Sequence, residues 1–357
     1  MEDSKRIAYF DLLRIVAGVL IVMVHVSAQG METLPLDSME YFWANFWNGA
    51  AFIGVALFVM LSGTLELDPA HPSDLKRIFL HKAARLFLIY YFWKAVFQCV
   101  IMLEQGISFT PGNIKEHLLL ALIQERGYYH LWFFLMLAVL FLFVPMIKPA
   151  VKDLQVCRYY LAGFLLVAVC YPVMMHYDFK FKYLLADFME RADFYLFTGY
   201  LGYFILGHFL HQSKERKEGQ AYVRWGLCIL TVACMLLSGY LGVLASGKSG
   251  TMENFLNTPF TPMIFLASVF IFLAGKGTES RLKGHPKLCK CFRFGPDLTL
   301  GICLLHPLIL NWMNHINLTP DIMPRVISIP LLTIVAVIPS GLAAWICKKI
   351  PLLKKLL

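Results

Sequence analysis

Charge is scarce in this sequence. Asp, Glu, Lys and Arg make up 15% of its 357 residues, whereas hydrophobic residues make up 59%. An ordinary soluble protein has roughly a quarter of its residues charged and about half of them apolar. No polar block between the apolar segments is long enough to fold alone. The composition therefore excludes an ordinary soluble protein and predicts one membrane domain that covers residues 1–357.

Other signals are missing as well. The formal net charge is +9, but the basic residues are scattered through short loops without interleaved aromatics, so no nucleic-acid partner is expected. The nine cysteines lie mostly in apolar segments and form no CxxC pair, which argues against a disulfide framework. His285, Cys289 and Cys291 form a small cluster, but zinc sites usually supply more ligands, so no metal is expected.

Apolar segments of about 20 residues recur along the chain, each long enough to cross the hydrocarbon core of a bilayer as a helix. The first of them contains Asp11 and Arg14 and has no small-residue cleavage site, so it is predicted to remain as a helix rather than act as a signal peptide. We expect an all-α polytopic membrane protein of about ten transmembrane helices. The predicted spans are 9–29, 49–66, 84–103, 129–147, 158–176, 193–212, 223–245, 258–276, 296–315 and 325–347.

The distribution of Lys and Arg predicts the orientation. With the N-terminus inside, the inside segments hold about 23 of these residues and the outside segments about 7. Positive charge is retained on the cytoplasmic side of a membrane, so both termini are predicted to be cytoplasmic. No internal repeat is evident, so an inverted-repeat transporter receives no direct support.

Titratable side chains at bilayer depth are costly and mark candidate functional sites. The first predicted helix, FDLLRIVAGVLIVMVH, contains Asp11, Arg14 and His25. Asp11 and Arg14 are spaced to pair on one face. His25 lies eleven positions after Arg14, which returns the helix to within about 20° of its starting direction after a rise of about 16 Å. The two side chains therefore share one stripe, with Arg14 near the cytoplasmic mouth and His25 beyond the midplane.

This stripe reaches from the cytoplasmic side towards the outer side, so it suits a reaction whose two substrates come from opposite sides of the membrane. A fixed cation at Arg14 suits a phosphate or carboxylate, and a neutral His25 can abstract a proton from a hydroxyl. A purely structural role is the alternative, in which Asp11 and Arg14 form an ion pair and His25 bonds a neighbouring helix.

Further polar residues accompany the apolar spans, and each also has a structural explanation. His130 and Trp132 begin the fourth span, where interfacial residues are common. His306 precedes Pro307 and suggests a kink around a cavity. Ser62 either favours close helix packing or lines a site, and Lys94 is either paired internally or lines the cavity. The basic residues Arg77, Lys82 and Arg85 either bind phosphates or extend to the membrane interface.

Several motifs along the chain resemble acyltransferase family 3 membrane proteins. The run FDLLR with His25 downstream is followed by ALFVMLSG, KAAR, YHLWFF, GYFILG and GICLLHPLI, in the same order as in the family. Within that family the chain looks most similar to the O-acetyltransferases of enterobacterial common antigen and related exopolysaccharide O-acyltransferases.

The resemblance implies a ten-helix enzyme of the bacterial cytoplasmic membrane, with no permanently bound cofactor. Such an enzyme takes an acyl group, commonly acetyl, from cytoplasmic acyl-CoA and delivers it to a hydroxyl of an extracytoplasmic glycan or lipid-linked saccharide. The family's functional histidine and arginine correspond to His25 and Arg14, and its basic RxxR motif to Lys82 and Arg85, where lysine replaces the first arginine.

The mechanism expected from this resemblance is O-acyl transfer. Arg14, Lys82 and Arg85, with Arg77 nearby, would orient the CoA phosphates, and Asp11 would position Arg14. His25 would act as general base or as nucleophile through an acyl-histidine. His130, Trp132 and His306 would shape the acceptor or acyl cavity. A transporter or exporter of a polysaccharide or small polar solute is the alternative. A sensor or assembly subunit of an envelope complex, which would work with envelope-assembly partner proteins, is another.

Overall fold

The computed structural model describes residues 7–357 apart from 71–73, 124–129, 193–196, 214–219 and 254–256, and it describes no side chains at 121, 123, 286–294 and 352. The starts of the predicted spans 129–147 and 193–212, and the side chains of Cys289 and Cys291, therefore lie outside the described residues.

The described residues form helices and no strands. The α-helices are α1 (Ala8–Ala28), α2 (Met39–Glu66), α3 (Leu75–Arg77), α4 (Ala84–Glu104), α5 (Pro111–Ile123), α6 (Trp132–Ile147), α7 (Leu154–Phe164), α8 (Tyr171–His176), α9 (Lys182–Ala192), α10 (Leu201–Gln212), α11 (Ala221–Ser249), α12 (Pro262–Lys276), α13 (Glu279–Gly284), α14 (Pro286–His315), α15 (Arg325–Cys347) and α16 (Pro351–Leu356). Short 3₁₀ turns are η2 (Met31–Thr33), η4 (Ala150–Lys152) and η7 (Pro320–Ile322), and π-helical segments are η3 (Ile78–Ala83) and η5 (Leu165–Cys170).

Seven helical stretches among the described residues are long and apolar enough to cross a membrane. They are α1 with η2, α2, α3 to α4, α7 to α8, α11, α12 with α13, and α15. The prediction of an all-helical, multi-pass membrane protein is confirmed.

The count of ten spans stays a prediction. The three further predicted spans coincide with α6, with α10 and with the second half of α14. Helices α6 and α10 are 16 and 12 residues long, shorter than the roughly 20 residues that cross a bilayer without tilt. The second half of α14 carries His306, Asn311, Asn314 and His315, which lower its hydropathy.

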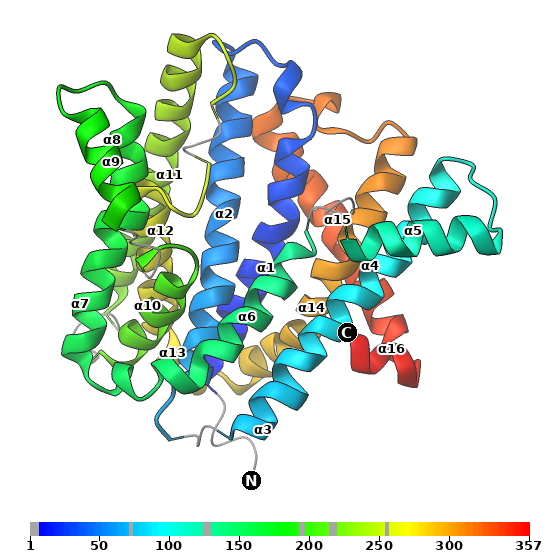
Figure 1. Cartoon of the computed structure of the whole chain (residues 1–357), viewed down its shortest axis with the longest axis horizontal. Coiled ribbons are helices and arrows are strands. Elements are labelled where there is room, and N and C mark those ends of the chain that lie inside the picture. Colours follow the sequence, from blue (N-terminus) through cyan, green and yellow to red (C-terminus); the bar gives the residue numbers. More distant parts are fainter. Residues whose placement is uncertain (1–6, 71–73, 124–129, 193–196, 214–219, 254–256) are drawn as a thin grey trace.

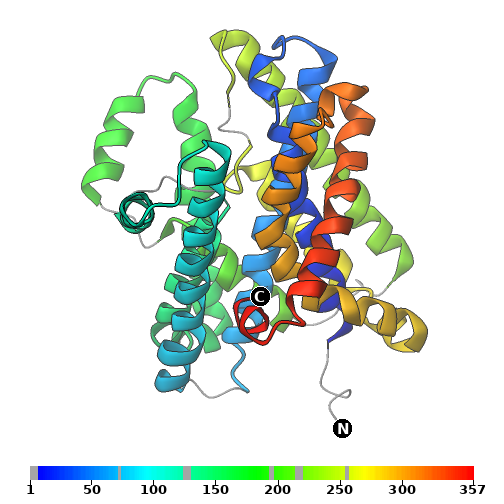
Figure 2. The same ribbon diagram turned by 90° about the vertical axis from the view of Figure 1, so that its right-hand side faces the viewer.

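Helices α1 and α2 form the centre of the bundle (Figure 1). Helix α1 contacts α2, α12, α14 and α15, and α2 contacts α10 and α11 on its other side. Figures 1 and 2 both place the start of α1 and the C-terminal helix α16 in the lower half of the molecule. Because α1 reaches from that lower end towards the opposite end, its polar residues sit at different depths of the bundle.

Glycines set the closest helix contact. A Cβ atom built on Gly63 of α2 would lie 1.8 Å from the carbonyl oxygen of Phe204 in α10, and one on Gly207 would lie 2.0 Å from that of Met60. Real side chains do not tolerate such distances, so these positions allow α2 and α10 to pack backbone against backbone, as small residues do between membrane helices. The sequence motifs ALFVMLSG and GYFILG meet at this contact.

A buried cation caps the end of α10. The Lys276 ammonium donates to the carbonyl oxygens of Leu210 at 3.0 Å and Ser213 at 2.6 Å. Carbonyls at a helix C-terminus lack intrahelical partners, and a cation there also interacts favourably with the helix dipole.

Candidate functional site

Three histidines from separate helices meet in the interior. The ring of His25 on α1 is stacked on the ring of His306 on α14, with centroids 5.1 Å apart and an angle of 18° between the planes. The ring of His130, two residues before the start of α6, meets His306 edge to face at 5.4 Å. The sequence marked each histidine separately, and the structure joins them into one cluster.

The orientation of His306 is fixed by its own helix. Its Nδ1 lies 3.1 Å from the carbonyl oxygen of Ile302, and because a carbonyl only accepts, Nδ1 carries the proton and donates. The Nε2 atom then has a lone pair, and among the described residues it has no hydrogen-bond partner. The next residue, Pro307, has no N–H to continue the helical hydrogen bonds. The cluster thus presents a buried acceptor nitrogen beside His25.

Two small cavities lie along α1. The first, the Arg14 cavity, has a volume of about 200 Å³ and is lined by Arg14, Ser62, Thr299 and mostly apolar neighbours. The second, the His25 cavity, has a volume of about 260 Å³ and is lined by His25, His130, Trp132 and apolar side chains. Phe133 of α6 lines both. The stripe expected on the first helix therefore lines two neighbouring cavities that share one aromatic wall.

The ion pair expected on α1 is present. Arg14 Nη1 lies 3.8 Å from Asp11 Oδ1. Asp11 is buried, whereas about a third of the Arg14 side chain is exposed. The buried carboxylate can hold the guanidinium at the cavity wall while leaving part of it accessible to an anion.

Comparison with known families identifies the chain. A family model described as an acyltransferase domain matches residues 7–346, nearly the whole length. The chain belongs to acyltransferase family 3. No curated protein and no solved structure matches it. The protein is therefore a membrane acyltransferase, and the resemblance found in its motifs is confirmed at the level of the family.

The basic residues expected at the donor side of this acyltransferase do not converge on one point. Lys82 Nζ lies 2.5 Å from Glu66 Oε2 at the end of α2. Arg85 is exposed, and its Nε donates to the carbonyl oxygen of Lys355 in α16 at 3.3 Å. Arg77 of α3 is exposed at the lower end of the bundle (Figure 1). Only Arg14 among these four cations lines the Arg14 cavity.

Of Ser62 and Lys94, only Ser62 lines one of the two cavities. Ser62 donates to the carbonyl oxygen of Phe58 at 2.8 Å and lines the Arg14 cavity, while its neighbour Gly63 makes the close helix contact. Lys94 is buried in α4, and its Nζ donates to the Tyr90 hydroxyl at 3.2 Å. Lys94 lines neither cavity, so the structure favours the internally paired arrangement.

Sequence reasoning missed the apolar and small polar residues of the site. Phe58, Phe133, Thr299 and Cys303 line the Arg14 cavity together with the predicted residues. The rings of Phe58 and Phe133 lie 6.0 Å apart. Phenylalanine occurs throughout the apolar helices, so nothing in the sequence distinguished these two from lipid-facing ones. Within the part of the chain that the structure describes, no three His, Cys, Asp or Glu residues are placed to hold a metal ion.

Proposed function

We propose that this acyltransferase, placed in the bacterial cytoplasmic membrane, moves an acyl group from cytoplasmic acyl-CoA to a hydroxyl of an extracytoplasmic glycan or lipid-linked saccharide. The observation that carries the proposal is the pair of cavities along α1, one lined by Arg14 and the other by His25, with Phe133 in the wall of both. The arrangement suits a donor that enters from one side of the membrane and an acceptor that arrives from the other.

The donor end is supported by charge. The guanidinium of Arg14 offers hydrogen-bond donors in a fixed planar arrangement, which suits a phosphate oxygen of CoA. Arg85 would add positive charge near the cytoplasmic mouth and raise the local concentration of the anionic donor, whereas Glu66 offsets the charge of Lys82. An extended pantetheine arm would reach along the stripe, which rises about 16 Å between Arg14 and His25. The small cavities favour a short acyl group such as acetyl.

The chemistry follows from the histidine cluster. His25 removes the proton of the acceptor hydroxyl as its oxygen attacks the thioester carbonyl. The new carbon–oxygen bond forms, the carbon–sulfur bond breaks, and the proton passes from His25 to the departing thiolate, giving CoA and the ester. The stacked ring of His306 holds the imidazole of His25 in place. A route through an acyl-histidine uses the same groups in two steps and predicts a labelled enzyme in the absence of acceptor.

The test uses the purified protein in nanodiscs with radiolabelled acetyl-CoA and a lipid and glycan extract from the cells that make it. We expect CoA release together with labelled extract. His25→Ala should lower kcat by about 10²–10⁴-fold, the range of general acid–base catalysis, without loss of folded protein. His315→Ala is the matched control, because His315 is exposed at the end of α14.

Two results would contradict the proposal. Absence of CoA release and of labelled product, alongside uptake of labelled solute into liposomes, would favour the transporter. Full activity of His25→Ala would remove this histidine from the mechanism.

A further inference from the structure

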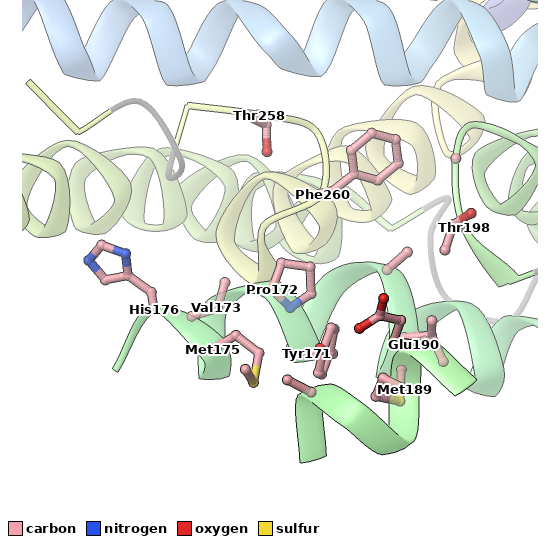
Figure 3. A pocket seen from close by; sticks show the side chains of 14 residues that line it. Tyr171, Pro172, Val173, Met175, His176, Met189, Glu190, Thr198, Thr258 and Phe260 are labelled. Carbon is pink, nitrogen blue, oxygen red and sulfur yellow. The ribbon is translucent and has the colours of Figure 1, made fainter. Parts of the chain in front are cut away.

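A larger groove lies near the His25 cavity and is not explained by the proposed donor path. It has a volume of about 970 Å³ and lies between η5 and α8 on one side, α9 on another, and the segment before α12 (Figure 3). Its lining is mostly apolar and includes Tyr171, Met189 and Phe260. We call it the α9 groove.

Polar groups stand at separate places in the α9 groove. Figure 3 shows His176 at one end and Glu190 with Thr198 towards the other, and Thr258 borders the groove from the opposite side. A few polar groups in a mostly apolar site are typical of pockets that fix the orientation of an amphipathic ligand. The volume is near the upper end of the range for such pockets, about 300–1,000 Å³, whereas each of the two cavities on α1 falls below it.

Three aromatic rings connect the α9 groove with the His25 cavity. Trp132 lines the His25 cavity, and its ring centroid lies 5.5 Å from that of Tyr200. The Tyr200 ring in turn lies 5.0 Å from Phe260, which lines the groove. The groove and the histidine cluster are therefore neighbours across a wall of aromatic side chains, which are suited to stacking against the apolar faces of sugar rings.

Helix α9, which forms one side of the groove, has the character of an interfacial helix. Its Tyr183 and Leu184 are 85% and 67% exposed, while Asp187 and Arg191 form an ion pair at 2.9 Å one turn further along. An amphipathic helix with exposed aromatic and aliphatic side chains beside charges is typical of the membrane–water interface. In Figures 1 and 2, α8 and α9 lie in the upper half of the molecule, away from the start of α1.

We infer that the α9 groove binds the acceptor, and that this acceptor is a lipid-linked saccharide. The apolar lining receives the first part of the lipid chain, which reaches the groove from the bilayer beside α9. Glu190, Thr198 and Thr258 accept hydrogen bonds from sugar hydroxyls, and the saccharide passes along Trp132 and Tyr200 to His25. This inference rests on the proposed function and adds to it the kind of acceptor and the place where it binds.

The kinetic test places a large side chain in the groove by a substitution on α9. Ala186 lines it, so Ala186→Trp should raise the KM for a lipid extract of the cells that make the protein by about tenfold or more, with the KM for acetyl-CoA unchanged. Leu184→Trp places the same indole ring on the exposed face of the same helix and is the control. Glu190→Gln should likewise raise the KM for the extract, whereas Asp187→Asn, on the exposed face, should not.

A second experiment compares a lipid-linked saccharide with a free one as the acceptor. Mild acid cleaves the bond between a polyprenyl diphosphate and its sugar, so the same extract after mild acid supplies the water-soluble saccharide. We expect labelled product from the intact extract and little from the hydrolysed one. Equal transfer to the hydrolysed extract would overturn the lipid-linked acceptor, and an unchanged KM in Ala186→Trp would overturn the groove as its site.

A photocrosslinking arm does not depend on activity. Benzoylphenylalanine at position 186, with position 184 as control, should capture a saccharide-bearing polyprenyl lipid from the extract at 186 alone, identified by mass spectrometry. Capture of phospholipid only, or of nothing, would overturn the inference. If the wild-type protein released no CoA while the variant with benzoylphenylalanine at 186 still captured this lipid, the proposed transfer would be contradicted and the proposed ligand of the α9 groove would not. The two failures are therefore distinguishable.

Discussion

The role of each histidine in the cluster depends on the side chains around it. A histidine in an apolar helix is often only a satisfied core residue, and this explanation was open for each of His25, His130 and His306. The stacking of His25 on His306 and the edge contact of His130 bring all three to one point. Because these contacts join α1, α14 and the start of α6, no spacing along the chain reveals them. The sequence identifies the three histidines as polar residues in apolar segments, but only the folded structure shows that they are in contact.

At the same scale, Phe133 is predicted to limit the size of the acyl group. Its ring lines both cavities on α1, so Phe133→Ala should join and widen them. We expect kcat/KM for butyryl-CoA relative to acetyl-CoA to rise by about tenfold, since one or two methylenes in an apolar pocket discriminate by this order. Steady-state rates with the two donors measure the ratio. Phe141→Ala on the same helix, which lines neither cavity, should leave it unchanged, and an unchanged ratio in both variants would contradict this role.

Pairs of elements are held together by small residues rather than by charge. Helices α2 and α10 approach through Gly63 and Gly207, and this contact lies beside Ser62 at the Arg14 cavity. The π-helical segment η3 joins α3 to α4, and η5 joins α7 to α8. Such insertions change the face that a helix presents, and they follow from packing, so hydropathy along the chain does not predict them.

The close contact between α2 and α10 predicts that one added methyl group at Gly63 lowers the stability of the protein. Gly63→Ala places a Cβ within 1.8 Å of the Phe204 carbonyl oxygen and should lower stability by about 1–3 kcal/mol, the usual cost of overpacking. In Gly226→Ala on α11 the new Cβ has no atom within 4 Å, so stability should stay unchanged or rise by about 0.4–1 kcal/mol. Thermal unfolding in detergent compares the two, and equal melting temperatures would show that the α2–α10 contact is not tight.

The whole molecule gives the site a direction across the membrane. The start of α1 and α16 lie in one half of the molecule, and α8 and α9 lie in the other (Figures 1 and 2). The excess of Lys and Arg in alternate loops predicts that the half with the start of α1 faces the cytoplasm. The proposed donor path depends on this orientation, because acyl-CoA is made in the cytoplasm and the Arg14 cavity must open there.

Reporter fusions measure the orientation directly. Alkaline phosphatase fused after Leu357 should be inactive, because it folds only outside the cytoplasm, and the same enzyme inserted after Lys180 should be active. Expression of both fusions is checked by immunoblot. The reverse pattern would place Arg14 on the outer side and contradict both the orientation and the proposed path of the donor.

The sequence by itself determined the class of fold, the family, and the presence of Asp11, Arg14 and His25 on one stripe of the first helix. These follow from local rules, since apolar length sets a membrane helix and helical periodicity sets which side chains share a face. Only the tertiary structure decided that Lys82 pairs with Glu66, that Phe133 lines two cavities, and that the α9 groove adjoins the histidine cluster. These depend on contacts between helices far apart in the chain, and apolar helices are too alike in composition for hydropathy and helical periodicity to predict which of them meet.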